Sequence, residues 1–200
     1  RVLSRNEQEQ FVSFLLDETD QCKFGVLLML LSGVRIGELC ALKWENVDLK
    51  ERTMRVSSTL QRLRNTEADN EKRTRIVVST PKSETSMRTI PLTDNVIRLC
   101  ERFADKNTSA FILTGTEDYM EPRVLQYRIE KYTKDCGLDG VHAHTLRHTF
   151  ATRAVEVGFE IKSLSEILGH SNTTITLERY VHSSMELKRL NMDKLTAVGL

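Results

Sequence analysis

Apolar residues recur at helical intervals along most of the chain, and the elements that they predict are mainly helices. Ser4-Arg-Asn-Glu7 has the spacing of a capping box, and Phe11 and Phe14 follow it at helical intervals. The run from Cys22 to Leu31 is apolar nearly all round, which predicts a core helix that ends at Ser32-Gly33. A short helix carrying Arg35 and Glu38 and further helices are expected at residues 94–104, 122–136, 144–157, 161–168, 173–180 and 184–195.

The segment from about residue 45 to residue 92 has a different pattern, in which polar and apolar residues alternate. This alternation predicts strands within residues 53–57, 75–79 and 87–91. The polar residues 65–72 predict a loop or a hairpin tip, and residues 81–85 predict a turn that joins two antiparallel strands. The expected fold class is therefore α+β and mainly α-helical, a single domain over residues 1–200 with a small antiparallel sheet inserted near its N-terminal third.

The composition is that of an ordinary globular protein. Of 200 residues, 40% are apolar and 28% are charged, and the longest apolar run is too short to span a membrane. The four cysteines show no CxxC or zinc spacing, which favours reduced thiols and a cytoplasmic location. A net charge of +1 is low for a nucleic-acid-binding protein, but lysines and arginines outnumber acidic residues between Arg52 and Arg88. A local basic face can therefore exist on a nearly neutral chain.

Groups that can carry positive charge gather on one face of the expected helix 144–157. His144, Arg147 and His148 are three and four residues apart and share that face. An arginine between imidazoles suits the binding of a phosphodiester, although a lone histidine in such a place is more often a packing residue. His144 and His148 could also share a zinc ion, but Thr145 stands where a zinc protease helix carries glutamate, and a third ligand is missing. No metal is expected.

A further histidine and a tyrosine follow this helix. Leu168-Gly169-His170 has the pattern of a helix end with a left-handed glycine cap, so His170 is expected to project from the cap. Tyr180 lies ten residues later. A tyrosine hydroxyl has an ordinary pKa of about 10, so it attacks a phosphodiester only where a base or a strongly cationic site assists it. Arg35, Arg147 and the histidines could form such a site if the fold brings them around Tyr180.

Taken in order, four stretches resemble the catalytic domain of tyrosine recombinases of the phage-integrase family. The four are Ser32-Gly-Val-Arg35-Ile-Gly-Glu38-Leu, His144-Thr-Leu-Arg147-His148-Thr-Phe-Ala-Thr, Leu168-Gly-His170-Ser and Tyr180-Val-His182. Each motif alone is moderately weak, but the ordered set is highly specific. The resemblance implies a site-specific recombinase that cleaves and rejoins DNA through a covalent 3′-phosphotyrosine, for integration or excision of a mobile element.

The resemblance also implies a role for each matching residue. Tyr180 would be the nucleophile, with His144 as the best-placed base, and Lys82, in the segment where the family has its catalytic lysine, would protonate the leaving 5′ oxygen. Arg35 and Arg147 would hold the phosphate, with His170 as the second active-site histidine. The expected catalytic set is Arg35, Lys82, His144, Arg147, His170 and Tyr180, with Glu38 and His148 in supporting positions.

The partners expected from the resemblance are double-stranded DNA and further copies of the chain, in the bacterial cytoplasm and on the nucleoid. A homo-tetramer would assemble on DNA, and the tail helix at 184–196 would dock onto a neighbouring protomer or, with comparable weight, onto its own domain. An accessory DNA-bending or excision factor is expected, and a nucleotide or other cofactor is not. We expect residues 1–200 to lack the family's N-terminal core-binding domain. The insert at 60–75 could contact DNA, contact a partner or form a solvated hairpin.

Two other functions remain open at the level of sequence. A type IB topoisomerase uses the same nucleophile and arginine chemistry but relaxes supercoils without exchanging partners. A DNA-binding regulator without catalytic activity would leave the grouped histidines, arginines and tyrosine without a purpose. Detection of a covalent protein–DNA adduct separates either enzyme from the regulator.

Overall fold

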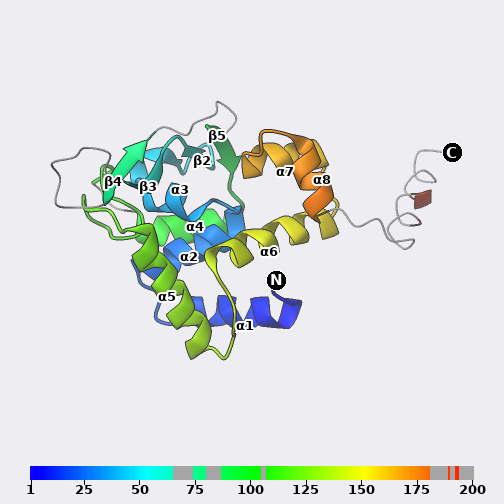
Figure 1. Ribbon diagram of the computed structural model, residues 1–200, viewed down its shortest axis with the longest axis horizontal. Helices are drawn as coiled ribbons and strands as arrows, with labels where there is room; N and C mark the ends of the chain where they lie inside the picture. Colours follow the sequence, from blue (N-terminus) through cyan, green and yellow to red (C-terminus); the bar gives the residue numbers. More distant parts are fainter. Residues whose placement is uncertain (65–73, 80–86, 105–106, 181–188, 190–191, 194–200) are drawn as a thin grey trace.

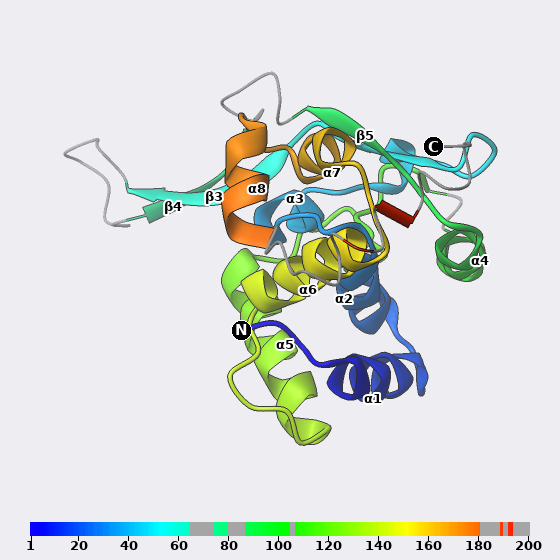
Figure 2. The same ribbon diagram turned by 90° about the vertical axis from the view of Figure 1, so that its right-hand side faces the viewer.

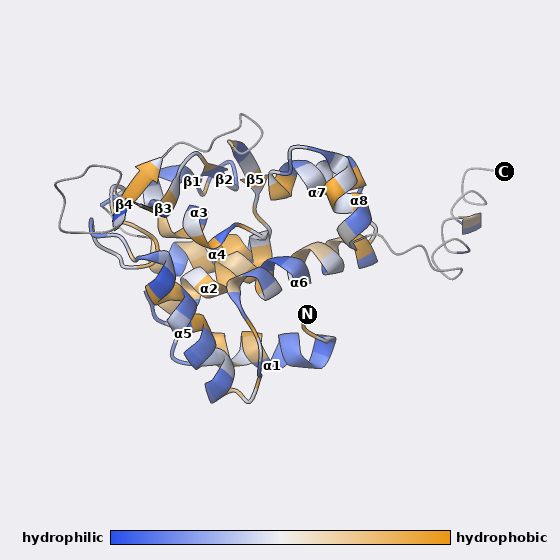
Figure 3. Ribbon diagram, viewed as in Figure 1, coloured by the Kyte–Doolittle hydropathy of each residue, from blue (hydrophilic) through white to orange (hydrophobic). Residues whose placement is uncertain are grey.

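Helices form most of the structure, and several of them pack around one buried central helix (Figure 1). The computed structural model describes residues 1–64, 74–79, 87–104, 107–180, 189 and 192–193. Helix α2 lies at the centre, where Figure 3 shows it as largely apolar, and it contacts α1, α4 and α6. The helix bounds are α1 Arg5–Leu16, α2 Gln21–Ser32, α3 Ile36–Cys40, α4 Asp94–Phe103, α5 Pro122–Asp135, α6 Ala143–Glu156, α7 Ile161–Leu168 and α8 Thr173–Tyr180, with a short 3-10 helix at Trp44–Asn46.

Local signals in the sequence explain where the first helices begin and end. Ser4 and Glu7 form the expected capping box, in which each side chain accepts a hydrogen bond from the backbone of the other residue. Helix α2 ends at Gly33, which adopts the left-handed conformation (φ +68°) that glycine tolerates without strain. The expected helices between residues 4 and 180 are confirmed to within about two residues. The expected tail helix at 184–196 lies almost wholly outside the described residues.

The strands form two small antiparallel sheets instead of one. Strands β1 (Val47–Asp48), β2 (Thr53–Val56) and β5 (Arg88–Pro91) pair in the order β1-β2-β5. Strands β3 (Thr59–Arg64) and β4 (Thr74–Ser79) pair with each other, with Leu60 opposite Val78. In Figure 2 this second sheet projects beyond the helical body.

The expectation that a turn at 81–85 joins two paired strands was wrong in one respect. The flanking strands β4 and β5 belong to different sheets, because β4 pairs with β3 and β5 pairs with β2. Strand β3 was not predicted from its sequence, since Thr59–Arg64 has too few apolar residues to show an alternation. The turn residues themselves lie outside the part of the chain that the structure describes.

Helices α6, α7 and α8 form the side of the molecule on which the chemistry-bearing residues gather. The three helices contact one another, and α7 also contacts β5 (Figures 1 and 2). A small apolar cluster of Ala151, Ala154, Leu164, Leu168 and Tyr180 holds them together. None of the described helices is long and apolar enough to cross a membrane.

Candidate active site

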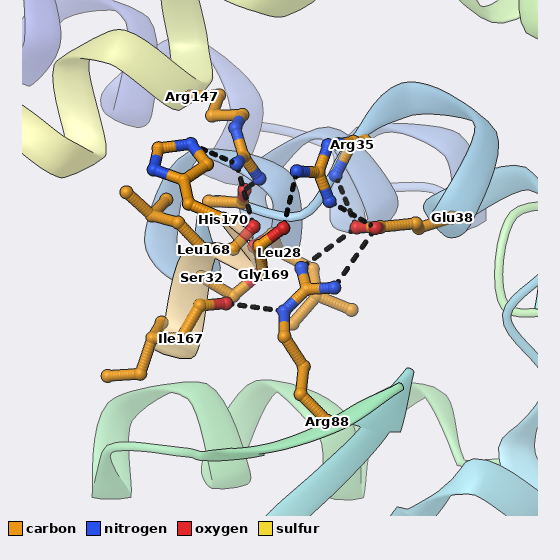
Figure 4. A network of polar contacts seen from close by, with 11 residues as sticks. Leu28, Ser32, Arg35, Glu38, Arg88, Arg147, Ile167, Leu168, Gly169 and His170 are labelled. Carbon is orange, nitrogen blue, oxygen red and sulfur yellow. Dashed lines mark hydrogen bonds and ion pairs between the residues drawn. The ribbon is translucent and has the colours of Figure 1, made fainter. Parts of the chain in front are cut away.

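The end of helix α7 organises the site, because three successive backbone carbonyls there each accept a hydrogen bond from a different arginine (Figure 4). The last carbonyls of a helix have no partner within the helix and carry a partial negative charge, so they attract guanidinium groups. Gly169 closes the helix in a left-handed conformation (φ +63°). The three bonds join Arg88 Nε to Ile167 O (2.5 Å), Arg147 Nη2 to Leu168 O (2.7 Å) and Arg35 Nη2 to Gly169 O (2.8 Å).

The buried carboxylate of Glu38 lies between two of these arginines. Arg35 Nη1 donates to Glu38 Oε1 (2.8 Å), and Arg88 donates to both carboxylate oxygens (3.0 and 2.9 Å). Burial raises the pKa of Glu38, but the hydrogen bonds and charge of Arg88, together with Arg35, outweigh burial and bring it below its ordinary value. Glu38 is therefore ionised at neutral pH and fixes both guanidiniums in place.

Arg147 is the most deeply buried cation of the group, with 5% of its surface exposed. Its Nη1 donates to Gly33 O (2.6 Å), which ties α6 to the end of α2. Burial and the neighbouring Arg35 lower the pKa of Arg147 to about 9, which still leaves it charged at neutral pH. Three guanidiniums and the Glu38 carboxylate thus give the group an excess of positive charge, which suits an anion with two or more exposed oxygens.

His170 connects this group to helix α8. Its Nε2 lies 3.0 Å from Arg147 Nη2, and its Nδ1 lies 2.8 Å from the hydroxyl of Thr176 on α8. The imidazole also stacks on the ring of Tyr180, with the ring planes 2° apart and the centroids 6.5 Å apart. The imidazole of His170 thus contacts the Tyr180 ring as well as the Arg147 guanidinium.

The hydroxyl of Tyr180 lies 2.7 Å from Nδ1 of His148 on helix α6. Tyr180 is buried among the helices, yet it lines one wall of a cavity of about 580 Å³ that His144, His148 and Thr152 also line. The tyrosine oxygen therefore lies beside an imidazole, and the residue itself borders an open cavity.

The position of His144 differs from the one expected for a base. His144 is exposed, and its ring centroid lies 6.4 Å from that of His148. It borders both the tyrosine cavity and a second cavity of about 530 Å³ that Arg35, Arg62 and Arg123 line. His144 thus stands at the rim between the two cavities, and His148 occupies the place beside Tyr180.

The structure brings together most of the residues that the sequence singled out. Six of them lie in one connected set, and His144 borders it, whereas Lys82 lies outside the described residues. Sequence reasoning did not single out Arg88, which contacts Glu38, or Thr176, which contacts His170. Among the described residues, no group of three or more His, Cys, Asp or Glu side chains could hold a metal ion. The connected set is Arg35, Glu38, Arg147, His148, His170 and Tyr180.

Comparison with known proteins gives consistent matches. The family model described as "Phage integrase family" matches residues 1–186. The transposase from transposon Tn916 of Enterococcus faecalis is 28% identical over 218 residues, which cover 96% of this chain and 52% of the transposase. A tyrosine recombinase XerC-like protein of Caldanaerobacter subterraneus subsp. tengcongensis is 28% identical over 172 residues, or 78% of this chain and 44% of that protein.

Solved structures match over nearly the whole chain. The Tn1549 transposon integrase in complex with a circular intermediate DNA has a TM-score of 0.76 and 26% identity, and the match covers 98% of this chain and 66% of that one. The XerA recombinase, with a TM-score of 0.68 and 22% identity, shares the fold. The chain spans about half the length of the curated relatives that it matches.

Proposed function

Because the chain belongs to the phage integrase family, whose model matches residues 1–186, we propose that it cleaves and rejoins DNA strands with Tyr180 as the nucleophile. The reaction would be site-specific recombination of a mobile element through a covalent 3′-phosphotyrosine. One observation carries the proposal: the Tyr180 hydroxyl lies 2.7 Å from His148, and one stacked imidazole separates its ring from Arg147. A tyrosine held only for packing would need neither group.

The arginines would bind the scissile phosphate. Phosphoryl transfer concentrates negative charge on the two non-bridging oxygens, and planar guanidiniums can hold such oxygens with paired hydrogen bonds. Arg35 and Arg147 already share the end of helix α7, so they need little rearrangement to meet one phosphate. Removing one preorganised donor of this kind typically costs on the order of 3–4 kcal/mol of transition-state stabilisation.

In the proposed cleavage step, one bond to phosphorus forms as another breaks, and each proton that is lost has an acceptor. The Tyr180 oxygen attacks phosphorus, its proton passes to Nδ1 of His148, and the bond between phosphorus and the 5′ oxygen breaks. The 5′ oxygen takes a proton from a general acid, for which Lys82 is the candidate from the sequence. Attack by a 5′ hydroxyl on the phosphotyrosine reverses these steps, so rejoining needs no nucleotide cofactor.

We propose double-stranded DNA as the substrate and a homo-tetramer as the active assembly. The Tn1549 transposon integrase, which this chain resembles in structure, is seen in complex with DNA. Positive side chains outnumber negative ones at the cavity that contains Arg35, since Arg62 and Arg123 line it together with Glu121, which pairs with Arg62. In the tetramer, the tail at 184–196 would dock on a neighbouring protomer, and an accessory DNA-bending factor would assist the exchange.

A nicked DNA substrate tests the proposed function directly. The chain is incubated with duplexes that carry candidate ends of its host element and a nick just 3′ of the cleavage site, so that the short 5′-hydroxyl fragment diffuses away. We expect a protein–DNA adduct that survives denaturation, and its loss in Tyr180→Phe with unchanged DNA binding. An adduct formed by the Tyr180→Phe chain would refute the assignment of the nucleophile.

A second assay separates recombination from the two other functions. Supercoiled plasmids that carry a pair of candidate sites are incubated with the chain, and the products are scored for relaxation and for exchange between sites. Relaxation without exchange would indicate a topoisomerase, and DNA binding without any adduct would indicate a regulator.

A further inference from the structure

Thr176 is a buried hydroxyl that lies one helical turn before Tyr180. The residue has 0% of its surface exposed, and its Oγ1 lies 2.8 Å from Nδ1 of His170. Thr176 and Tyr180 are four residues apart on α8 and therefore share one face of the helix. Both residues on that face contact His170: the Thr176 hydroxyl contacts Nδ1, and the Tyr180 ring stacks on the imidazole.

The contacts of His170 assign the position of its proton. Arg147 can only donate hydrogen bonds, so His170 Nε2, 3.0 Å from Arg147 Nη2, must accept and carries no hydrogen. The proton of the neutral ring is then on Nδ1, and the Thr176 hydroxyl accepts it. The opposite tautomer would place an N–H group against an N–H group of Arg147, which is repulsive.

We propose that Thr176 is a positioning residue that couples the docking of the nucleophile helix to the orientation of His170. By accepting the Nδ1 proton, Thr176 holds the unprotonated Nε2 toward Arg147, so that His170 accepts a hydrogen bond from Nη2 and orients the guanidinium that would bind the phosphate. Because Thr176 and Tyr180 share one face of α8, the same docking step brings the nucleophile to His148 and fixes His170. The inference rests on the proposed function, since it concerns the readiness of that site.

Nitrogen-15 NMR spectra of the histidine rings test the orientation without DNA. A protonated and an unprotonated ring nitrogen differ widely in chemical shift, so the spectra report the tautomer, and His170→Gln identifies the His170 signals among the five histidines. We expect the Nδ1–H form in the unmodified chain. Thr176→Val keeps the buried volume but lacks the hydroxyl, so the Nδ1–H group loses its acceptor; we expect the ring to turn away from Arg147 and the Nδ1–H form to lose its preference. Thr176→Ser keeps the hydroxyl and should retain it.

Single-turnover cleavage of the nicked substrate tests the coupling. We expect Thr176→Val to cleave roughly 10- to 100-fold more slowly with unchanged DNA binding, a loss of the size seen when the hydrogen-bond partner of a metal-ligating histidine is removed. Thr176→Ser should recover most of the rate. The matched control is Thr174→Val, which makes the same substitution at an exposed position of the same helix.

Failure of the inference about Thr176 and failure of the proposed function give different experimental results. An Nε2–H tautomer in the unmodified chain would overturn the inference, and so would cleavage by Thr176→Val at the unmodified rate. An Nδ1–H spectrum in a chain that forms no adduct would refute the proposed function instead.

Discussion

Replacing Arg88 with methionine removes one of the two guanidiniums that hold the buried Glu38 carboxylate. Both side chains of this pair are almost fully buried, with 6% of Arg88 and 4% of Glu38 exposed. Methionine fills a similar space without a charge or a donor. The variant therefore leaves Glu38 with Arg35 as its remaining charged partner in the group and leaves Ile167 O without the bond from Arg88.

The expected loss of stability follows from this geometry. Removal of one partner from a buried ion pair typically destabilises a protein by about 3–5 kcal/mol, because the other charge stays buried. Since Arg35 still contacts Glu38, we expect the lower end, about 3 kcal/mol at pH 7. For a chain of this size, that corresponds to a decrease in melting temperature of roughly 6–12 °C.

The pH dependence gives the prediction a second component. In the unmodified chain the pKa of Glu38 is lowered, so its contribution to stability is present above the ordinary value of 4.5 and is lost as the pH falls through the folded-state pKa. Without Arg88, burial should dominate and raise the pKa of Glu38 above its ordinary value. The ionised carboxylate then destabilises the variant most at pH 7, so the difference between the two proteins should shrink as the pH falls toward 4.5.

Urea unfolding at several pH values measures both effects. The matched control is Arg5→Met, which breaks an exposed pair with Glu156 and should change the free energy of unfolding by less than about 1 kcal/mol. Glu38→Gln in the Arg88→Met background should recover part of the lost stability, because it removes the buried charge. A loss below about 1 kcal/mol for Arg88→Met, or a loss that is the same at all pH values, would refute the reasoning.

Three further substitutions test the site. Arg147→Lys should slow adduct formation by at least about 100-fold in the nicked-substrate assay, because a lysine cannot reproduce the two bonds that the planar guanidinium makes to Gly33 O and Leu168 O; adduct formation near the unmodified rate would contradict this. His148→Gln should slow cleavage by roughly 100-fold or more, and His144→Gln by less, in the same adduct assay; the reverse order would make His144 the base. Gly169→Ala should lower the free energy of unfolding in urea by about 1–2 kcal/mol, because residue 169 has a φ of +63°. The new methyl carbon would also lie 2.9 Å from Arg88 Nη1. Unchanged stability would contradict this expectation.

Helix positions could be predicted because the information is local. The capping box at Ser4 and Glu7 and the glycine at the end of α2 fix the ends of helices through contacts with neighbouring residues. Strand pairing could not be predicted in the same way. Strand β5 pairs with β2, which lies more than thirty residues earlier, and the sequence between them contains a separate hairpin. Alternation indicates that a strand exists, but it does not identify its partner.

The candidate site was predictable in its residue types but less so in its contacts. Helical periodicity places His144 and His148 on one face of α6, and only the docking of α8 decides that the tyrosine meets His148. Arg88 looks from the sequence like an ordinary polar residue of a strand. It is buried because Glu38, fifty residues earlier, supplies a carboxylate and α7 supplies a carbonyl.

The use of main-chain oxygens at the end of helix α7 has a consequence for natural variation. Every amino acid has a backbone carbonyl, so residues 167 and 168 can change in side chain without losing the acceptors for Arg88 and Arg147. The left-handed conformation of Gly169 fixes the geometry of the turn. The two hydrogen bonds to main-chain oxygens place no constraint on the side chains of residues 167 and 168. Divergent homologues could therefore keep the same arrangement of cations behind very different local sequences, and a search by residue identity alone would overlook it.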